Sequence, residues 1–265
     1  MYSRFQLAKK YLSYYFTAAN GKGHGVHSPF VFDFITNVLN DKKNYDCYNK
    51  IENVRNKLLQ NNEEISVMDF GAGSSLIKTN RRIVKKMAAS SLKPKKFAQL
   101  LFRITNHYNP KTILELGTSF GVTTSYLATG NPQAKVYTFE GSSAIASIAK
   151  QNFNSLHLNS IHLTEGDFSE TLPELLAKLP TIDLAFIDGN HRKEPTLEYF
   201  RQLLNHSNNT TILIFDDIHW SAEMEAAWEE IKAHPAVTQS IDLFFIGIVL
   251  FNSNFVAKQH FVVRF

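Results

Sequence analysis

The chain has 265 residues, of which 44% are hydrophobic and 20% charged, and its formal net charge is +4. This composition is ordinary for a globular protein with a sizeable core. The longest apolar stretch, residues 243–251, is too short to span a bilayer as a helix, so we expect no membrane partner. The single Cys47 cannot form an internal disulfide, which fits a reducing, cytoplasmic location.

The N-terminal residues need separate attention because they imitate a secretion signal. Three basic residues, Arg4, Lys9 and Lys10, precede an apolar stretch at residues 11–19. A serine and several tyrosine hydroxyls interrupt that stretch. An amphipathic helix over residues 3–19 is therefore the better interpretation.

More helices are expected up to residue 110. Ser28-Pro29 is a typical helix start, with Ser28 as the N-cap and Pro29 at the first helical position. The candidate helices cover residues 3–19, 29–39, 48–60 and 96–108, and the last one ends at Asn109-Pro110. We expect residues 1–110 to form a helical extension or cap, and residues 111–265 to form a second domain.

Positive charge is concentrated in one part of this N-terminal region. Between Asp69 and Glu115 there is no acidic residue, whereas ten basic residues occur there: Lys78, Arg81, Arg82, Lys85, Lys86, Lys93, Lys95, Lys96, Arg103 and Lys111. One interpretation is a solvated helical face, since runs of like charge usually face water. The other is a docking surface for an anionic substrate or a nucleic acid.

From Lys111 the pattern changes to short strands separated by helix-length segments. The candidate strands are rich in branched apolar residues and cover residues 112–116, 135–140, 160–165, 182–187 and 210–215. A helix is expected over residues 221–233. This alternation predicts a parallel sheet with helices on both faces.

The alternation stops after that helix. Residues 237–251 and 260–265 follow with no helix between them, and we expect them to pair as an antiparallel hairpin. Residues 237–251 are either one bent strand or two, since Gly247 is a candidate bulge. The expected fold class is α/β: a Rossmann-like, doubly wound, mostly parallel seven-stranded sheet with an antiparallel C-terminal hairpin, plus a mainly helical N-terminal cap.

The first strand of this region ends in a glycine turn. Glu115 is followed by Gly117 and Gly121, and a second acid, Glu140, ends the next strand. A carboxylate at that second position can accept both hydroxyls of a ribose. A pyrophosphate site requires Gly-x-Gly-x-x-Gly, but Ser119 stands at the middle glycine and the spacing differs. The pattern therefore favours an adenosine-containing ligand without phosphates.

These motifs resemble those of class I S-adenosylmethionine-dependent methyltransferases. The resemblance covers residues 111–265 and includes Asp167-Phe168 after the third strand, which would hold an adenine. It implies that S-adenosylmethionine is bound by Glu115, Gly117, Thr118, Ser119, Gly121, Glu140, Gly141, Asp167, Phe168 and Asp188.

A second glycine turn competes with the first. Asp69-Phe70-Gly71-Ala72-Gly73-Ser74 taken alone is more similar to the methyltransferase signature than residues 115–121 are. No strand that ends in an acid follows it within 30 residues. We therefore interpret it as a turn, either at the surface or in a lid that borders the active site.

Acidic residues end the fourth and fifth strands as well. Asp188 follows one, and Asp216-Asp217 follow the other. Parallel strands end at the same edge of a sheet, so these three carboxylates should converge, and they repel one another unless a cation intervenes. Oxygen ligands suit Mg²⁺, Ca²⁺ or Mn²⁺.

This arrangement is similar to the metal-dependent small-molecule O-methyltransferases of the catechol and antibiotic-sugar types. The resemblance implies metal binding by Asp188, Asp216 and Asp217. It departs where the family has a third acidic residue as general base, because Asn190 stands there and an amide cannot take a proton. Either His191 is the base, or the metal alone acidifies the substrate, or the reaction differs. His219 is a weaker candidate for the base.

The expected partner is a small hydroxylated acceptor, with an anionic one suggested by the basic run. A nucleic-acid methyltransferase and a non-catalytic S-adenosylmethionine-binding protein remain alternatives. A nicotinamide oxidoreductase is disfavoured by the glycine spacing. A homodimer is an open alternative for the assembly.

Overall fold

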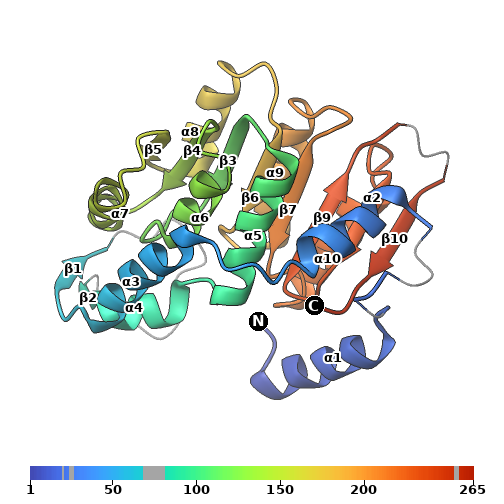
Figure 1. The fold of residues 1–265 in the computed structure, drawn as a ribbon, viewed down its shortest axis with the longest axis horizontal. Coiled ribbons are helices and arrows are strands. Elements are labelled where there is room, and N and C mark those ends of the chain that lie inside the picture. Colours follow the sequence, from blue (N-terminus) through green and yellow to red (C-terminus); the bar gives the residue numbers. More distant parts are fainter. Residues whose placement is uncertain (20, 24–26, 68–80, 254–256) are drawn as a thin grey trace. The chain divides into compact units, whose positions relative to one another are not determined.

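The computed structural model describes residues 1–19, 21–23, 27–67, 81–253 and 257–265. The chain divides into two compact units. Their helices and strands are labelled in Figure 1. The first unit contains residues 1–41 and 176–265, and the second contains residues 42–175. Eight strands of the described residues, five in the first unit and three in the second, belong to a mostly parallel sheet, which confirms the predicted fold class with one strand more than expected.

The second unit begins with helices. They are α3 (Asp46–Gln60), α4 (Val84–Ser91) and α5 (Lys95–Tyr108), and a small antiparallel pair of strands, β1 (Glu64–Ser66) and β2 (Arg81–Ile83), lies between α3 and α4 in the chain. The predicted helices at residues 48–60 and 96–108 are therefore confirmed. The sequence analysis did not predict β1, β2 or α4, since three-residue strands have too few residues to show alternation.

The rest of the second unit alternates strands and helices as predicted. Its elements are β3 (Thr112–Leu116), α6 (Val122–Gly130), β4 (Lys135–Glu140), α7 (Ser143–Ser155), β5 (Ile161–Glu165) and α8 (Phe168–Leu176). Strand β4 lies between β3 and β5 and is parallel to both. The core joins this part to the preceding helices, because the Tyr48 ring of α3 contacts Phe102 of α5 at 5.0 Å and Tyr126 of α6 at 5.6 Å between ring centroids.

The first unit carries the N-terminal helices and the C-terminal strands. Its elements are α1 (Arg4–Thr17), α2 (Pro29–Asp33), η1 (Phe34–Leu39), β6 (Leu184–Ile187), α9 (Lys193–Leu204), β7 (Ile212–Asp216), α10 (Ala222–Ala233), β8 (Gln239–Asp242), β9 (Ile246–Leu250) and β10 (Gln259–Val262). Every residue of β6 and β7 is buried, as in a parallel sheet covered on both faces. Ser28 is the N-cap of α2 as predicted, since its hydroxyl accepts the backbone N–H of Val31.

The C-terminal strands differ in part from the prediction. Residues 237–251 form two strands, and the antiparallel hairpin is the pair β8–β9, closed by a tight loop in which Phe244 has φ +70°. Strand β10 pairs parallel to β8, so the expected antiparallel pairing of residues 237–251 with 260–265 is wrong. The reason is that the apolar pattern of a strand does not encode its direction. No helix of the described residues is long and apolar enough to cross a membrane.

The two compact units divide the chain after residues 41 and 175, not at residue 110. The division into a cap of residues 1–110 and a domain of residues 111–265 stays a prediction. The second glycine turn, at residues 69–74, lies outside the described residues.

Gly247 is explained by a close approach of an aromatic ring to the backbone of β9. A Cβ atom at this position would lie 2.7 Å from the Cη2 and Cζ3 atoms of Trp228 on α10, whose side chain is fully buried. Gly247 is regularly paired with Phe215 and Asp242, so it is not a bulge. The glycine therefore allows α10 to pack closely on the sheet.

We predict that Gly247→Ala lowers the free energy of unfolding by about 1–3 kcal/mol, because the added methyl overpacks the contact with Trp228. Urea titration measures the change. In a double-mutant cycle, Trp228→Phe should remove part of the cost of Gly247→Ala, since the smaller ring leaves room for the methyl group. Additive effects of the two substitutions would show that the close approach does not explain the glycine.

Candidate functional site

The turn after β3 is built around the buried carboxylate of Glu115. Its Oε2 atom accepts a hydrogen bond from Thr138 Oγ1 at 2.6 Å and a second one from Thr124 Oγ1. Thr118 Oγ1 lies 2.6 Å from Thr138 Oγ1. A hydroxyl has one proton to donate, so Thr138, which donates to Glu115, accepts from Thr118. The sequence analysis missed Thr124 and Thr138; the signal for Thr138 is the register that pairs it with Glu115.

The second carboxylate oxygen of Glu115, Oε1, differs from Oε2 in its surroundings. Glu115 is fully buried, and its Oε1 atom has no hydrogen-bond partner among the described residues. Burial raises the pKa of Glu115 to about 7, although the bonds from Thr124 and Thr138 pull it down. A buried oxygen without a donor is costly, and a ligand that supplies an N–H group would remove that cost. The residues present therefore fit a ligand with an amino group.

Glu140 fixes the shape of the same turn. Its Oε2 atom accepts the backbone N–H of Ser119 at 2.9 Å, and its Oε1 atom accepts the backbone N–H of Ser142 at 3.0 Å. Ser119 has φ +48°, a conformation that is unfavourable for a residue with a side chain and needs such support. A carboxylate oxygen has further lone pairs, so Glu140 can still accept hydroxyl groups of a ligand.

Gly121, the second glycine of the turn, has a packing reason. Gly121 has φ +79°, and a Cβ atom there would lie 2.4 Å from Cε1 of Phe153 on α7. The sequence analysis attributed this glycine to the approach of a ligand. The contact with Phe153 is by itself sufficient to require a glycine, because even alanine would clash.

The motif after β5 also has a local function. Asp167 Oδ1 accepts the N–H of Ser169 at 2.7 Å and its hydroxyl at 2.7 Å, which caps the start of α8. The Phe168 ring contacts Phe139 edge to face with 6.3 Å between centroids. Gly141, directly after Glu140, is half-buried. These residues belong to the second unit, together with Glu115, Thr118 and Glu140.

A separate cluster lies at the ends of β6 and β7 in the first unit. Asp188, His191 and Asp216 each offer one ligand atom, and these atoms all lie within 4.8 Å of one another. His191 Nε2 is 3.5 Å from Asp188 Oδ1. Asp216 is buried, whereas the other two are half-buried. The donor set of two carboxylates and an imidazole is suitable for a divalent metal ion.

The structure thus groups two of the three predicted metal ligands with His191. Asp217 is not in this group of described residues; its backbone N–H donates to Phe245 O at 2.7 Å, and it has φ +52°. His191 was predicted as a base and not as a ligand, and its i,i+3 spacing from Asp188 is the signal that could have indicated the second role.

The loop that carries His191 has an unfavourable backbone. Asn190 has φ +68° and His191 has φ +31°. Non-glycine residues in this region cost on the order of 1 kcal/mol each and tend to occur at functional sites. The Asn190 side chain supports the loop, since it accepts from Arg192 Nη2 at 2.9 Å and donates to Tyr199 Oη at 3.3 Å. Asn190 therefore has a structural role where the resembled family has an acid.

His219 is engaged in a network of ion pairs. Its Nε2 lies 2.8 Å from Asp242 Oδ2, and its Nδ1 lies 3.0 Å from Glu225 Oε1. Burial lowers the pKa of His219, but the bonds and charges of Asp242 and Glu225 outweigh burial, so the pKa is raised above its usual value. Lys10 of α1 also binds Glu225, at 2.9 Å. These contacts give His219 a structural role in tying α1 to the first unit.

The basic run is not uniformly a surface feature. Arg103 is buried on α5, and Arg82, Lys85 and Lys93 are half-buried. Lys78 lies outside the described residues. A docking role for the whole run stays a prediction.

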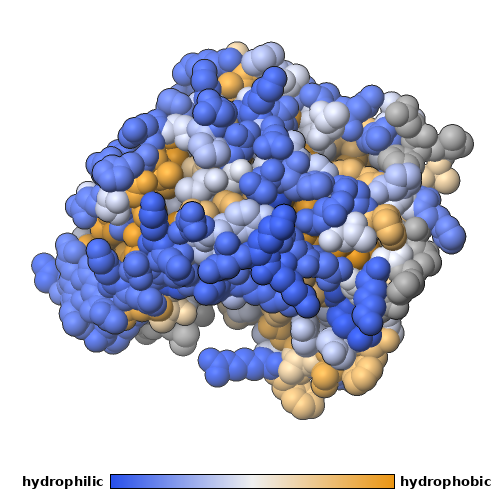
Figure 2. All heavy atoms as spheres, viewed as in Figure 1, coloured by the Kyte–Doolittle hydropathy of each residue, from blue (hydrophilic) through white to orange (hydrophobic). Residues whose placement is uncertain are grey.

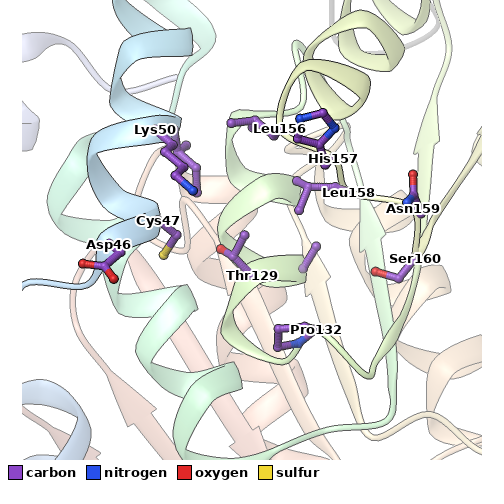
Figure 3. A pocket seen from close by; sticks show the side chains of 12 residues that line it. Asp46, Cys47, Lys50, Thr129, Pro132, Leu156, His157, Leu158, Asn159 and Ser160 are labelled. Atoms are coloured by element: carbon purple, nitrogen blue, oxygen red, sulfur yellow. The ribbon is translucent and has the colours of Figure 1, made fainter.

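One cavity of the second unit lies away from the predicted cofactor residues. It has a volume of about 680 Å³ and lies beside the amino ends of β4 and β5, whereas the predicted residues follow the carboxyl ends. Figure 3 shows Cys47 and Lys50 of α3 opposite Thr129 and Pro132, with the segment 156–160 on the other side. None of its lining residues was predicted as functional.

Comparison with known proteins gives the class of the domain. Residues 114–218 match the family model described as a methyltransferase domain. No curated protein matches the chain in sequence. The matched segment begins within β3 and ends just after Asp217, so it includes the glycine turn, Glu140 and the strand ends with the carboxylate cluster.

Solved structures share the fold at low sequence identity. An O-methyltransferase from Bacillus cereus in complex with S-adenosylhomocysteine is 21% identical, with a TM-score of 0.58, over 82% of this chain and 96% of that chain. A methyltransferase from Podospora anserina, also bound to S-adenosylhomocysteine, is 14% identical, with a TM-score of 0.57, over 96% and 98%. The O-methyltransferase TomG from Streptomyces achromogenes, involved in tomaymycin synthesis, is 15% identical, with a TM-score of 0.55, over 80% and 92%. The domain match over residues 114–218 and the shared fold agree with the predicted class, an S-adenosylmethionine-dependent methyltransferase.

The raised pKa of Glu115 predicts how pH affects the ligand-free protein. In the folded state the pKa of Glu115 is about 7, compared with 4.5 for an unperturbed group. Between these two pH values the carboxyl group is therefore ionised in the unfolded chain but protonated in the folded protein. Relative to Glu115→Gln, the wild type should lose stability as pH rises through this window, on the order of 3 kcal/mol in total.

Urea unfolding at about pH 5 and about pH 8 measures this difference. Glu198→Gln, at an exposed position on α9, is the matched control and should show no such change. A pH-independent difference between wild type and Glu115→Gln would mean that Glu115 has an ordinary pKa.

Proposed function

We propose that this methyltransferase acts on an oxygen of a small hydroxylated acceptor and that a divalent metal ion assists the transfer. The observation that carries the proposal is the Asp188–His191–Asp216 cluster, with ligand atoms within 4.8 Å of one another at the ends of two neighbouring parallel strands. The O-methyltransferases from Bacillus cereus and Streptomyces achromogenes, which share the fold, support oxygen as the accepting atom.

S-adenosylmethionine would be held by the second unit. Its methyl group is attached to a positively charged sulfur and is the group to be transferred. Glu115 Oε1 would accept a hydrogen bond from the amino group, and the backbone from Gly117 to Gly121 would follow the ligand, with Thr118 and Ser119 in the turn. Glu140 and Gly141 would contact the ribose, and Asp167 and Phe168 the adenine. The unpaired buried oxygen of Glu115 is the support that comes from this chain's own structure.

The acceptor would be bound through the carboxylate cluster of the first unit. A divalent ion there lowers the pKa of a bound hydroxyl. Asp188, Asp216 and Asp217 would supply oxygen ligands, which suits Mg²⁺. His191, whose Nε2 lies 3.5 Å from Asp188 Oδ1, would then accept the proton of the acceptor hydroxyl.

The cluster also leaves a second arrangement open for the metal. If His191 is itself a ligand, the set contains a nitrogen and favours a metal such as Zn²⁺ over Mg²⁺. The metal that gives the highest turnover therefore distinguishes His191 as base from His191 as ligand. Residues 1–110 would act as a cap that shapes the acceptor site.

We predict that Asp216→Asn lowers methyl transfer by about a hundredfold or more, because loss of a charged ligand weakens both metal binding and activation of the hydroxyl. Transfer of a labelled methyl group from S-adenosylmethionine to a panel of hydroxylated small molecules, with and without Mg²⁺, Mn²⁺ or Zn²⁺, measures the effect. Glu198→Gln on exposed α9 is the control for loss of an unrelated carboxylate.

Calorimetry of S-adenosylmethionine binding separates the two parts of the proposal. Asp216→Asn should bind the cofactor as the wild type does. Metal-independent turnover on the same panel would contradict metal assistance but keep the methyltransferase. Binding of S-adenosylmethionine without turnover on any acceptor would favour a non-catalytic S-adenosylmethionine-binding protein. Turnover on nucleic acid alone would favour a nucleic-acid methyltransferase.

A further inference from the structure

Helix α1 has two apolar faces, and only one of them is packed. On the packed face, Tyr14 is buried and the Tyr11 ring lies 5.1 Å from Phe244 between centroids. Tyr14 also donates from its hydroxyl to Val263 O at 2.5 Å. Lys10, on the same side, pairs with Glu225. This face fixes the helix to the first unit.

The other face presents large apolar side chains to solvent (Figure 2). Their exposed fractions are 82% for Met1, 81% for Phe5, 55% for Leu12, 42% for Tyr15 and 76% for Phe16. Met1 precedes the helix, and at 100° per residue the other four positions fall within one stripe on the side of α1 away from the packed face. Exposed aromatic and aliphatic groups gathered in this way indicate an interaction surface.

Positive charges border this apolar stripe. At the same helical period, Arg4 falls at one edge of the stripe and Lys9 at the other, and both are exposed. Helix α1 contains no acidic residue, and the first acidic residue of the whole chain is Asp33. The surface is therefore apolar in the middle and cationic along both margins.

The charges of Arg4 and Lys9 distinguish two possible partners of the stripe, a second copy of α1 and a bilayer surface. A second copy of α1 would bring the Arg4 and Lys9 cations of both copies together without an acidic partner. Its area is also small, since a helix of 14 residues is about 21 Å long and offers roughly 200 Å² of face, compared with about 800 Å² per partner in a stable interface. An anionic bilayer surface accepts the apolar side chains below its headgroups and pairs with the cations at the headgroup level.

We propose that α1 is a peripheral membrane-binding helix that inserts its Phe5–Leu12–Phe16 stripe into the interface of an anionic bilayer, with Arg4 and Lys9 contacting the headgroups. This revises the expectation of no membrane partner, which considered only spanning segments. The helix remains docked on the first unit through Tyr11 and Tyr14, because its packed and exposed faces are different. Binding through α1 is independent of the acceptor and of the metal.

Sedimentation of the full chain with vesicles tests this proposal. The wild type should bind vesicles of phosphatidylcholine mixed with phosphatidylglycerol and should bind pure phosphatidylcholine at least about tenfold more weakly. The triple variant Phe5→Ser, Leu12→Ser and Phe16→Ser should lose binding by about tenfold or more. Arg4→Gln with Lys9→Gln should lose it on anionic vesicles only.

Phe32→Ser is the matched control, since Phe32 is exposed at 49% but lies on α2. Because all substituted side chains are exposed, each variant should keep the thermal midpoint of the wild type, which circular dichroism checks. Absence of vesicle binding by a folded wild type, or equal binding to neutral and anionic vesicles, would overturn the proposal. So would a wild-type dimer that becomes a monomer in the triple variant, because a second copy would then cover the stripe.

Discussion

The negative charge of acidic side chains at the carboxyl ends of parallel strands must be balanced by nearby hydrogen-bond donors, and several neighbouring elements supply these donors. Glu115 is buried and receives two threonine hydroxyls, one from α6 and one from β4. Glu140 receives two backbone N–H groups, and so fixes the glycine turn after β3. Asp188 lies beside an imidazole. Because these partners come from several elements, the position of each acid depends on the correct pairing of neighbouring strands.

The compensation of Glu115 is incomplete, and this place is suited to a ligand. One oxygen of Glu115 lacks a hydrogen-bond donor among the described residues although it is buried. At the ends of β6 and β7, two carboxylates and a histidine offer ligand atoms within 4.8 Å of one another. Positive φ angles at Ser119, Asn190, His191 and Asp217 occur at the same strand ends. Such conformations cost energy and persist only where the surrounding structure holds them.

Local patterns in the sequence were sufficient for most elements. Strands β3 and β4 have the predicted bounds, because each is a short run of branched and aromatic residues between turn signals. Ser28 was recognisable as a cap from its own chemistry. What could not be predicted depends on contacts between distant residues: the parallel pairing of β10, the threonines around Glu115, and the close approach of Trp228 to Gly247. The positions of these acids at the ends of strands could therefore be predicted, but their hydrogen-bond partners could not.

We propose that the turn held by Glu115 and Glu140 binds the adenosine and amino acid parts of S-adenosylmethionine. A crystal structure of the full chain with S-adenosylhomocysteine would test this binding mode. We expect the amino group of the ligand to lie within hydrogen-bond distance of Glu115 Oε1 and its ribose hydroxyls to contact Glu140, while Ser119 keeps its bond to Glu140. A ligand bound elsewhere, for example in the cavity beside Cys47 and Thr129, with the oxygen of Glu115 still unpaired, would contradict it.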